Sequence, residues 1–201
     1  MDNSPEVINN ILNNELFSCE SILKSNENLK QIKDFLVKRQ GAKGLEFYLK
    51  ENAISDEYSG QARTFLVKDK DTNEIACYFS LKTGLVSVNE KRFLFHKEFD
   101  SMSGIELSNF AVNDNYKDNH PEIEHIGMIV FSEFIYPIVE YVSNFVGVSL
   151  LYLFALPDEN LVTHYQKLHF QRLPRKEERS IHRRMRPRYD KSCIFMCQRL
   201  K

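Results

Sequence analysis

The pattern of apolar and polar positions is most regular between residues 104 and 170. Residues 104–112 form a largely apolar run bounded by polar residues, which predicts a strand. Apolar residues then recur at helical spacing over 126–146, which predicts a long helix; they are Ile126, Ile129, Val130, Phe134, Ile138, Tyr141, Val142 and Phe145. Residues 149–156 are almost entirely apolar, as expected for a strand covered on both faces. A strand–helix–strand unit of this length predicts a right-handed crossover and a parallel strand pair.

Polar residues, prolines and glycines predict where these elements end. Residues 113–125 are interpreted as a polar loop, and Gly147 stands where a left-handed helix C-cap belongs. Pro137 predicts a kink, or an unpaired carbonyl at Glu133, because proline has no N–H to donate. Pro157 ends the second strand, and residues 158–170 are predicted to form a closing helix. A ligand is expected at the carboxyl ends of the two strands, near the start of the long helix.

The flanking sequence predicts further short elements. Before the central stretch we expect a helix capped by Ser4, a strand over 16–23, a helix capped by Ser25, and a third helix over 45–54. Residues 62–68 and 74–82 are predicted to form a hairpin, while 82–100 fit either a continued strand or a second hairpin. Residues 192–198 are predicted to be the final strand. The sequence shows no internal repeat and no low-complexity linker, so a single domain over 1–201 is expected.

Composition narrows the function classes. With 201 residues, 42% of them hydrophobic and 15 of them Phe, the chain can fill a sizeable core. A net charge of −1 argues against wholesale attraction to nucleic acid or membrane. The four cysteines form neither a zinc pattern nor a disulfide framework, and the six histidines have no metal-ligand spacing, so no metal is predicted. The polar N-terminus and the absence of a span of about 20 apolar residues predict a reduced cytoplasmic protein.

One segment departs from this near-neutral balance. Residues 172–191 contain nine Lys or Arg and three acids. A charge run is most often a solvated surface. An anionic partner is the functional alternative, either a nucleic acid backbone, coenzyme phosphates or an acidic protein. Aromatic interleaving comes only from Phe170, His182 and Tyr189, which gives base stacking little support.

The central stretch resembles the acetyl-CoA-binding half of the GNAT acetyltransferase superfamily. Residues 110–117, Phe-Ala-Val-Asn-Asp-Asn-Tyr-Lys, look like the fourth strand and the entry to the pyrophosphate loop. Ile126-Gly127 at the head of a long helix looks like the end of that loop. Leu156-Pro-Asp158, followed by Tyr165-Gln-Lys-Leu-His-Phe170, looks like the fifth strand and the helix that carries the family's tyrosine.

The resemblance implies a fold and a co-substrate. The implied fold is α+β: a mixed, mostly antiparallel sheet of six to seven strands with a parallel strand 4/strand 5 pair, flanked by helices. Acetyl-CoA is the implied co-substrate, and the residues implied to bind it are Phe110, Ala111, Val112, Lys117, Ile126, Gly127, Met128 and Asp158. The loop between Lys117 and Gly127 is longer than the family pattern, lacks its first glycine, and adds three acids, Asp118, Glu122 and Glu124.

The resemblance also implies catalytic roles. Tyr165 is the candidate general acid toward the coenzyme sulfur, because a phenol can donate a proton to a thiolate. Glu106 is the candidate general base, lying five residues before Ala111, where histone-type members carry a catalytic glutamate. A packing tyrosine and an ion-paired strand glutamate are the alternatives. His169 replaces the family's usual glycine. Neither Ser108 nor Cys77 lies in a nucleophile motif.

Three functions remain open on the sequence. The leading one is an N-acetyltransferase that transfers acetyl from acetyl-CoA directly to an amine. A toxin-like acetyltransferase acting on aminoacyl-tRNA is suggested by Arg63-Thr-Phe, by Asp158 and by the basic segment. A non-catalytic module that binds an anionic partner through residues 172–191 is the third. Phe47, Tyr48 and Tyr58 are candidate acceptor contacts, although core packing is the stronger interpretation for each, and a homodimer is left open.

Overall fold

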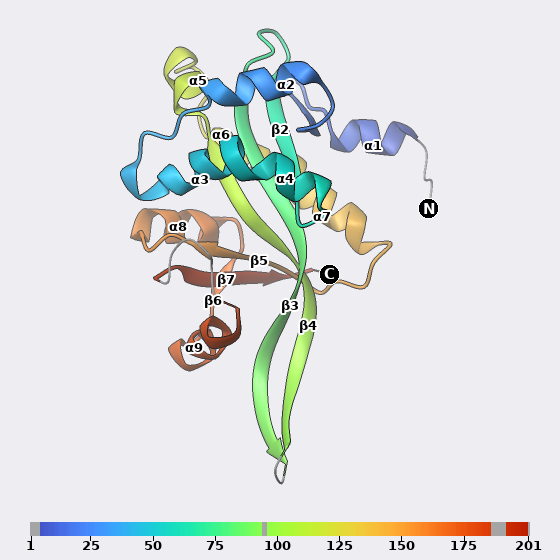
Figure 1. The fold of residues 1–201 in the computed structure, drawn as a ribbon, viewed down its shortest axis with the longest axis vertical. Helices are drawn as coiled ribbons and strands as arrows, with labels where there is room; N and C mark the ends of the chain where they lie inside the picture. Colours follow the sequence, from blue (N-terminus) through green and yellow to red (C-terminus); the bar gives the residue numbers. More distant parts are fainter. Residues whose placement is uncertain (1–4, 94–95, 186–191, 201) are drawn as a thin grey trace. The chain divides into compact units, whose positions relative to one another are not determined.

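The computed structural model describes residues 5–93, 96–185 and 192–200. Its strands form one seven-stranded sheet in the order β1-β2-β3-β4-β5-β7-β6. The chain groups into two compact units, residues 1–81 with 109–141 (unit 1) and residues 82–108 with 142–201 (unit 2). Two long strands, β3 (Ile75–Phe93) and β4 (His96–Val112), contribute residues to both units (Figure 1). Residues 82–93 therefore continue the predicted strand as part of β3, and residues 96–100 belong to β4.

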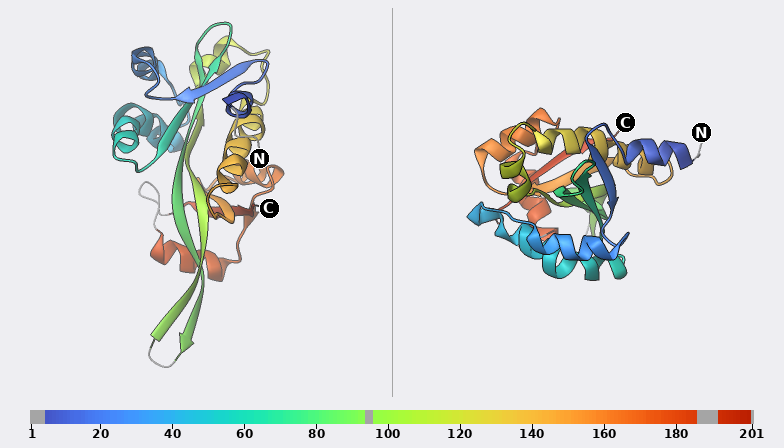
Figure 2. Two further views of the ribbon diagram at one scale, coloured as in Figure 1. Left: turned by 90° about the vertical axis from the view of Figure 1, so that its right-hand side faces the viewer. Right: turned by 90° about the horizontal axis from the view of Figure 1, so that it is seen from above.

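Unit 1 is a three-layer arrangement. Figure 2 shows the helices of residues 26–58 on one face of the strands and the helix of residues 126–143 on the other. The strands β1 (Phe17–Ser21) and β2 (Arg63–Asp69) pair antiparallel, as do β2 and β3. The helical elements before β2 are α1 (Pro5–Ile11), α2 (Asn26–Gln31), the 3-10 turns Ile32–Asp34 and Gln40–Ala42, α3 (Lys43–Phe47), a π-helix (Tyr48–Asn52) and α4 (Ala53–Tyr58).

Local sequence signals explain several of these boundaries. Ser25 caps α2 as predicted, with its Oγ accepting a hydrogen bond from the Asn28 N–H at 3.2 Å. The predicted β2–β3 hairpin is confirmed, and its turn is stabilised by Asp69, whose Oδ1 accepts from the N–H groups of Asp71 and Thr72. The first helix is present as α1, whereas the predicted cap Ser4 lies outside the described residues.

The long predicted helix is continuous from Ile126 to Ser143 but not uniform. It consists of α6 (Ile126–Val130), a π-helix (Phe131–Ile135) and α7 (Tyr136–Ser143). The Tyr136 N–H donates to the Phe131 carbonyl, five residues back. Since Pro137 has no N–H, the predicted irregularity takes the form of this wide turn immediately before the proline.

The predicted end of this helix was wrong. The helix stops at Ser143, and the N–H groups of Phe145 and Val146 both turn back to the Val142 carbonyl at 3.0 Å. Gly147 therefore lies beyond the turn, and its φ is not positive; among the described glycines, Gly60 alone has a left-handed φ, of 71°.

The helix Ile126–Ser143 is also the one helix in the described part of the chain that is long and apolar enough to cross a membrane, judged by length and composition alone. Its inward side chains Val130, Phe134 and Val139 are fully buried within unit 1. The face of the helix that carries these residues is therefore part of the core of unit 1.

The interpretation of residues 113–125 as a loop was incomplete, because they contain α5 (Asp114–Asn119). Asn113 caps this helix, accepting a hydrogen bond from the Asn115 N–H at 3.2 Å. Tyr116 anchors it with a side chain that is only 1% exposed. A single apolar residue leaves no period to detect in the sequence.

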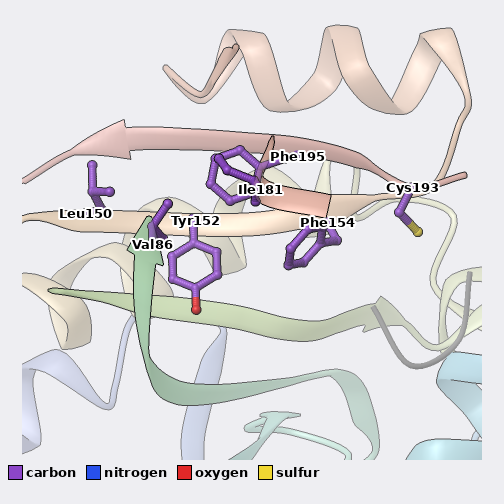
Figure 3. Close-up of a cluster of buried hydrophobic side chains, with 7 residues drawn as sticks. All are labelled: Val86, Leu150, Tyr152, Phe154, Ile181, Cys193 and Phe195. Carbon is purple, nitrogen blue, oxygen red and sulfur yellow. The ribbon is translucent and has the colours of Figure 1, made fainter. Parts of the chain in front are cut away.

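Unit 2 is organised around β5 (Leu150–Ala155), which is buried along its whole length. β5 pairs parallel with β4 and antiparallel with β7 (Ile194–Arg199), and β7 pairs with the short β6 (Gln171–Arg172). The predicted parallel pair and the predicted final strand are thereby confirmed. The helices are α8 (Glu159–Lys167) and α9 (Arg175–Arg184). Figure 3 shows the apolar cluster of this unit, in which Tyr152, Phe154 and Phe195 pack with Ile181.

The GNAT resemblance implies an extended loop or hairpin for the basic segment, residues 172–191, between the last helix and the last strand. This expectation was wrong for residues 175–184, which form α9. Ile181 is fully buried in the apolar cluster and fixes one face of the helix. Acids stand in the first turn and bases in the last, which complements the helix dipole. Arg186, Arg188 and the rest of 186–191 lie outside the described residues.

We expect Gly84→Ala to destabilise the protein. A Cβ at Gly84 would lie 1.8 Å from the hydroxyl oxygen of Tyr152, a side chain that is 1% exposed and has no room to move. Overpacking of this kind costs about 1–3 kcal/mol, and each kcal/mol lowers Tm by about 2–4 °C in a chain of this size.

Gly44→Ala is the matched control, because a Cβ there meets nothing within 4 Å and the residue lies inside α3. It should raise stability by roughly 0.5–1 kcal/mol. Thermal unfolding of both variants is the measurement, and equal melting temperatures would contradict the close packing of Tyr152 on Gly84.

Candidate functional site

The parallel β4–β5 ladder is short. Its pairs are Gly104 with Leu150, Ile105 with Leu151 and Glu106 with Tyr152. Both strands continue past the last pair, β4 to Val112 and β5 to Ala155. Within unit 2 the described ladder thus ends at Glu106 and Tyr152, at the carboxyl side of a parallel pair, where α/β sheets commonly bind ligands.

The last pair of this ladder carries a buried polar group. Glu106 is 8% exposed, and its Oε1 lies 3.2 Å from Lys82 Nζ. Tyr152 is in hydrogen-bond contact with Glu106, and burial together with the Glu106 charge raises the pKa of Tyr152 well above its usual value. The phenol therefore stays protonated and donates to the carboxylate. Glu106 is a carboxylate with two fixed partners, one cationic and one neutral.

α8 positions two of the predicted site residues. Asp158 caps the helix, its Oδ1 accepting a hydrogen bond from the Leu161 N–H at 2.9 Å. Tyr165 lies two turns later and is 7% exposed, with its ring edge-on to Phe170 at 5.6 Å between centroids. The helix ends earlier than predicted, and His169 follows with a φ of 67°. A histidine thus adopts the left-handed conformation that a glycine would adopt without strain.

In unit 1, residues 110–112, which were predicted to bind the coenzyme, are followed by an asparagine with several hydrogen bonds. Ala111 is buried, Phe110 and Val112 are half-buried, and Asn113 follows them. The Asn113 N–H donates to the Ala76 carbonyl at 2.9 Å, its Nδ2 donates to the Ile75 carbonyl at 2.8 Å, and its Oδ1 accepts from the Leu36 N–H at 3.1 Å. These contacts fix the backbone at the end of β4.

The start of α6 has the geometry of an anion-binding turn. His125 is left-handed, with φ 57° and ψ 28°, and the right-handed helix begins at Ile126. Successive residues of opposite hand turn their N–H groups inward into a concave nest. The Met128 N–H donates to the His125 carbonyl at 2.8 Å, whereas the N–H groups of Ile126 and Gly127 meet no acceptor among the described residues.

The acids of the 117–127 loop are partly neutralised by neighbours. Asp118 forms an ion pair with Lys38, and Glu122 Oε1 lies 3.3 Å from His120 Nδ1. The second ring nitrogen of His120 lies 2.8 Å from Glu74, and the ring stacks on Tyr116 at 4.2 Å. Lys117 is exposed, and His125 Nε2 lies 3.9 Å from Glu124 Oε2. The expected negative charge near the turn is therefore smaller than the sequence suggests.

Sequence reasoning missed Lys82, Tyr152 and Asn113. Tyr152 lies within an apolar run, where a single hydroxyl is easily taken for a packing tyrosine, and Lys82 is the last residue of the predicted strand 74–82, where a polar residue is ordinary. The signal that could have found Tyr152 is register: a parallel partner strand brings Glu106 opposite it. Within the described residues, no group of three His, Cys, Asp or Glu could hold a metal ion.

Comparison with known proteins identifies the fold. No family model and no curated protein matches the sequence. Among solved structures, a tyrosine-to-phenylalanine mutant of KacT has a TM-score of 0.62 at 15% identity, over 92% of this chain and 95% of that one. A tyrosine-to-phenylalanine mutant of the AtaT toxin, bound to the C-terminus of the antitoxin AtaR and acetyl-CoA, has a TM-score of 0.60 at 12% identity, over 92% and 94%. AtaT complexed with acetyl-methionyl-tRNAfMet has a TM-score of 0.59 at 13% identity, over 89% and 93%.

The chain therefore has the fold of these proteins along almost its whole length. The predicted GNAT-like α+β fold is confirmed, with its seven-stranded mixed sheet and its parallel β4–β5 pair. The predicted roles of single residues are not tested by these likenesses and remain predictions.

We expect the contribution of His120 to the free energy of unfolding to decrease as pH rises. The hydrogen bond to Glu74, reinforced by Glu122, raises the pKa of His120 above its usual value. A raised folded-state pKa means that the interaction is fully present below the unfolded value of about 6.5 and is lost as pH rises through the folded value. The stability difference between wild type and His120→Gln should shrink by about 0.5–1 kcal/mol between pH 6 and pH 9.

Urea unfolding at both pH values measures this difference. His164→Gln provides a control of opposite sign, because burial lowers the pKa of His164, so the neutral ring favours folding more as pH rises. A His120→Gln difference that does not change with pH would contradict the ion pairs.

Proposed function

We propose that this protein is a GNAT-type N-acetyltransferase that transfers the acetyl group of acetyl-CoA directly to an amine. The observation that carries the proposal is the end of the parallel β4–β5 ladder at Glu106 and Tyr152. Both strands continue beyond it, in a fold shared with a toxin structure that holds acetyl-CoA. An extended ligand can pair with strand backbone that the sheet leaves uncovered.

In this proposal the coenzyme is bound mainly through backbone groups. The pantetheine arm lies along Phe110, Ala111 and Val112, whose backbone is fixed by the contacts of Asn113. The diphosphate binds at the turn into α6, where the N–H groups of Ile126 and Gly127 meet no acceptor among the described residues. Charge-assisted hydrogen bonds from such groups contribute about 1.5–3 kcal/mol each, and the helix dipole favours the anion. Lys117 adds an exposed cation, Met128 closes the first turn, and Asp158 fixes the start of α8.

The chemistry follows from the groups that this chain provides. The amine nitrogen attacks the thioester carbonyl, an oxyanion forms, and its collapse breaks the C–S bond. A backbone N–H from the end of β4 that donates to this oxyanion would contribute about 3–4 kcal/mol. Tyr165 donates its proton to the departing thiolate, and Glu106 accepts the proton that the amine loses. Lys82 and Tyr152 orient Glu106 for this step.

A second candidate acceptor is the α-amine of an aminoacyl-tRNA. AtaT has been solved with acetyl-methionyl-tRNAfMet, and α9 adds a basic surface to this chain. A side-chain amine with a pKa of about 10.4 needs roughly 4–5 kcal/mol to become neutral at pH 7, whereas an α-amine of pKa about 8 needs only about 1–1.5 kcal/mol. Because Glu106 is already tied to Lys82 and Tyr152, an acceptor that depends little on a base suits this site. Assays with charged tRNA, peptides and lysine-like amines decide between the acceptors.

The cysteines fit a reducing compartment. All four are free thiols, and Cys19, Cys77 and Cys193 are buried. Free cysteines of this kind are typical of cytoplasmic proteins, and we assign the activity to the cytoplasm.

Acetyl-CoA should stabilise the protein against heat. At a free concentration of one hundred times Kd, a ligand that binds only the folded state adds about 2.7 kcal/mol. For a chain of this length that is a rise in Tm of roughly 5–10 °C, measurable in a thermal shift assay. Lys117→Glu should weaken binding by roughly 3–10-fold, about 1 kcal/mol, while Lys33→Glu, an equally exposed change on the 3-10 turn, should not. No shift at millimolar acetyl-CoA would favour a non-catalytic binding module.

Tyr165→Phe should lower kcat by roughly 100-fold or more, because it removes the proton donor. The coenzyme Kd should change less than threefold, because phenylalanine retains the ring contact with Phe170. Steady-state kinetics and a binding isotherm separate the two effects, with Tyr136→Phe as the matched control. An unchanged kcat would exclude Tyr165 from proton transfer and leave it a packing residue.

A further inference from the structure

Basic side chains surround a hollow on the surface of unit 2. The hollow measures about 470 Å³ and is formed by β6, α9 and the residues that lead into β7. Its basic lining residues are Arg172, Arg175, Arg179 and His182, and its floor includes Glu178 and Cys193. None of these residues has a role in the proposed acetyl transfer.

The helical repeat places three of these side chains on one face of α9. Arg175, Arg179 and His182 are separated by four and three residues, the spacing of neighbours along one side of a helix. The Arg179 Nε donates to the Arg175 carbonyl at 3.2 Å, which fixes the stem of that side chain and leaves its terminal nitrogens for another acceptor. Ile181 lies on the opposite side of α9 from these residues and is fully buried in the apolar cluster. This burial fixes the orientation of α9 about its axis, so the three basic side chains remain on the same side of the helix.

The one carboxylate that lines the hollow, that of Glu178, already has two partners within the protein. Glu178 is 7% exposed, with Oε1 accepting from the Phe195 N–H at 3.1 Å and Oε2 lying 3.4 Å from Arg172 Nη2. Three guanidinium groups and one carboxylate leave a net charge of +2 before His182 is counted. Among the described residues, neither Arg175 nor Arg179 has a carboxylate partner.

His182 adds an unsatisfied donor or acceptor. Its Nε2 is buried and has no hydrogen-bond partner among the described residues. The ring is fixed beside Phe154, at 6.0 Å between centroids. Buried polar atoms are normally paired, so an unpaired nitrogen of this kind in a residue that lines the hollow calls for an explanation.

We propose that this hollow is a binding site for a phosphate group. Guanidinium groups present planar pairs of N–H donors that match two phosphate oxygens, and Arg175 and Arg179 bring two such groups to the hollow. The volume admits a phosphate together with the sugar that bears it. The phosphate belongs either to a free phosphorylated small molecule or to RNA, since the recognising chemistry is common to both.

The test compares two double variants of one helix. Arg175→Ala/Arg179→Ala removes two charges that line the hollow, and Lys176→Ala/Arg183→Ala removes two exposed charges of α9 that do not line it. The probes are inorganic phosphate, measured by calorimetry, and one short RNA with a 5′-phosphate or a 5′-hydroxyl, measured by fluorescence anisotropy. We expect the first variant to weaken binding at least tenfold and the control to change it less than threefold.

The probe arms identify the source of the phosphate. Binding of inorganic phosphate with a preference for the 5′-phosphorylated RNA supports a free or terminal phosphate, and equal binding of both RNAs supports a backbone phosphate. Equal losses in the two variants would overturn the site in favour of diffuse surface charge, and so would undiminished binding in Arg175→Ala/Arg179→Ala. Acetylation of a simple amine by the same variants provides an independent readout, so failure of this site and failure of the transferase assignment are distinguishable.

Discussion

The arrangement of unit 2 depends on the contacts of one side chain, Tyr152. Its side chain lies against Gly84, where a Cβ would collide with it, and against Gly104, where a Cβ would come within 3.1 Å of the ring, and its hydroxyl donates to Glu106. The same ring stacks on Phe195 at 5.7 Å and so joins the apolar cluster beneath α9. Because Tyr152 belongs to the last pair of the β4–β5 ladder, the position where the two strands stop pairing and the position of the buried carboxylate are fixed by the same residue.

The acidic loop before α6 departs from the pattern that the resemblance led us to expect. Its extra residues include acids, but Asp118 forms an ion pair with Lys38 and Glu122 lies beside His120, so both charges are partly compensated. The backbone at His125 and Ile126 then provides opposite-handed geometry without the missing glycine. His169 is a similar case, because it adopts a left-handed φ of 67° at a position where the resemblance led us to expect glycine. Backbone shape at this site is therefore less restricted by sequence than a motif implies.

Strong periodicity and specific caps made much of the fold predictable. The buried β5, the long central helix, the β2–β3 hairpin and the Ser25 cap all follow from local pattern. α5 and α9 could not be found in this way, because each is anchored by few apolar residues, chiefly Tyr116 and Ile181, and the burial of each depends on distant segments. The contacts of Glu106 with Lys82 and Tyr152 could not be predicted from the sequence either, because they depend on strand register and not on spacing along the chain.

The wide turn at Phe131–Ile135 has a consequence for reading this chain beside its distant structural neighbours. A π turn contains one residue more than the α-helix it interrupts, so the residues after it keep their orientation while the count along the chain advances by one. Against a neighbour whose helix lacks this turn, a gapless alignment would assign every later helical position to the wrong counterpart, and identities of 10–17% are too low to reveal the shift. Correspondence between residues on its two sides should therefore be taken from superposed coordinates, with the extra residue assigned to the bulge.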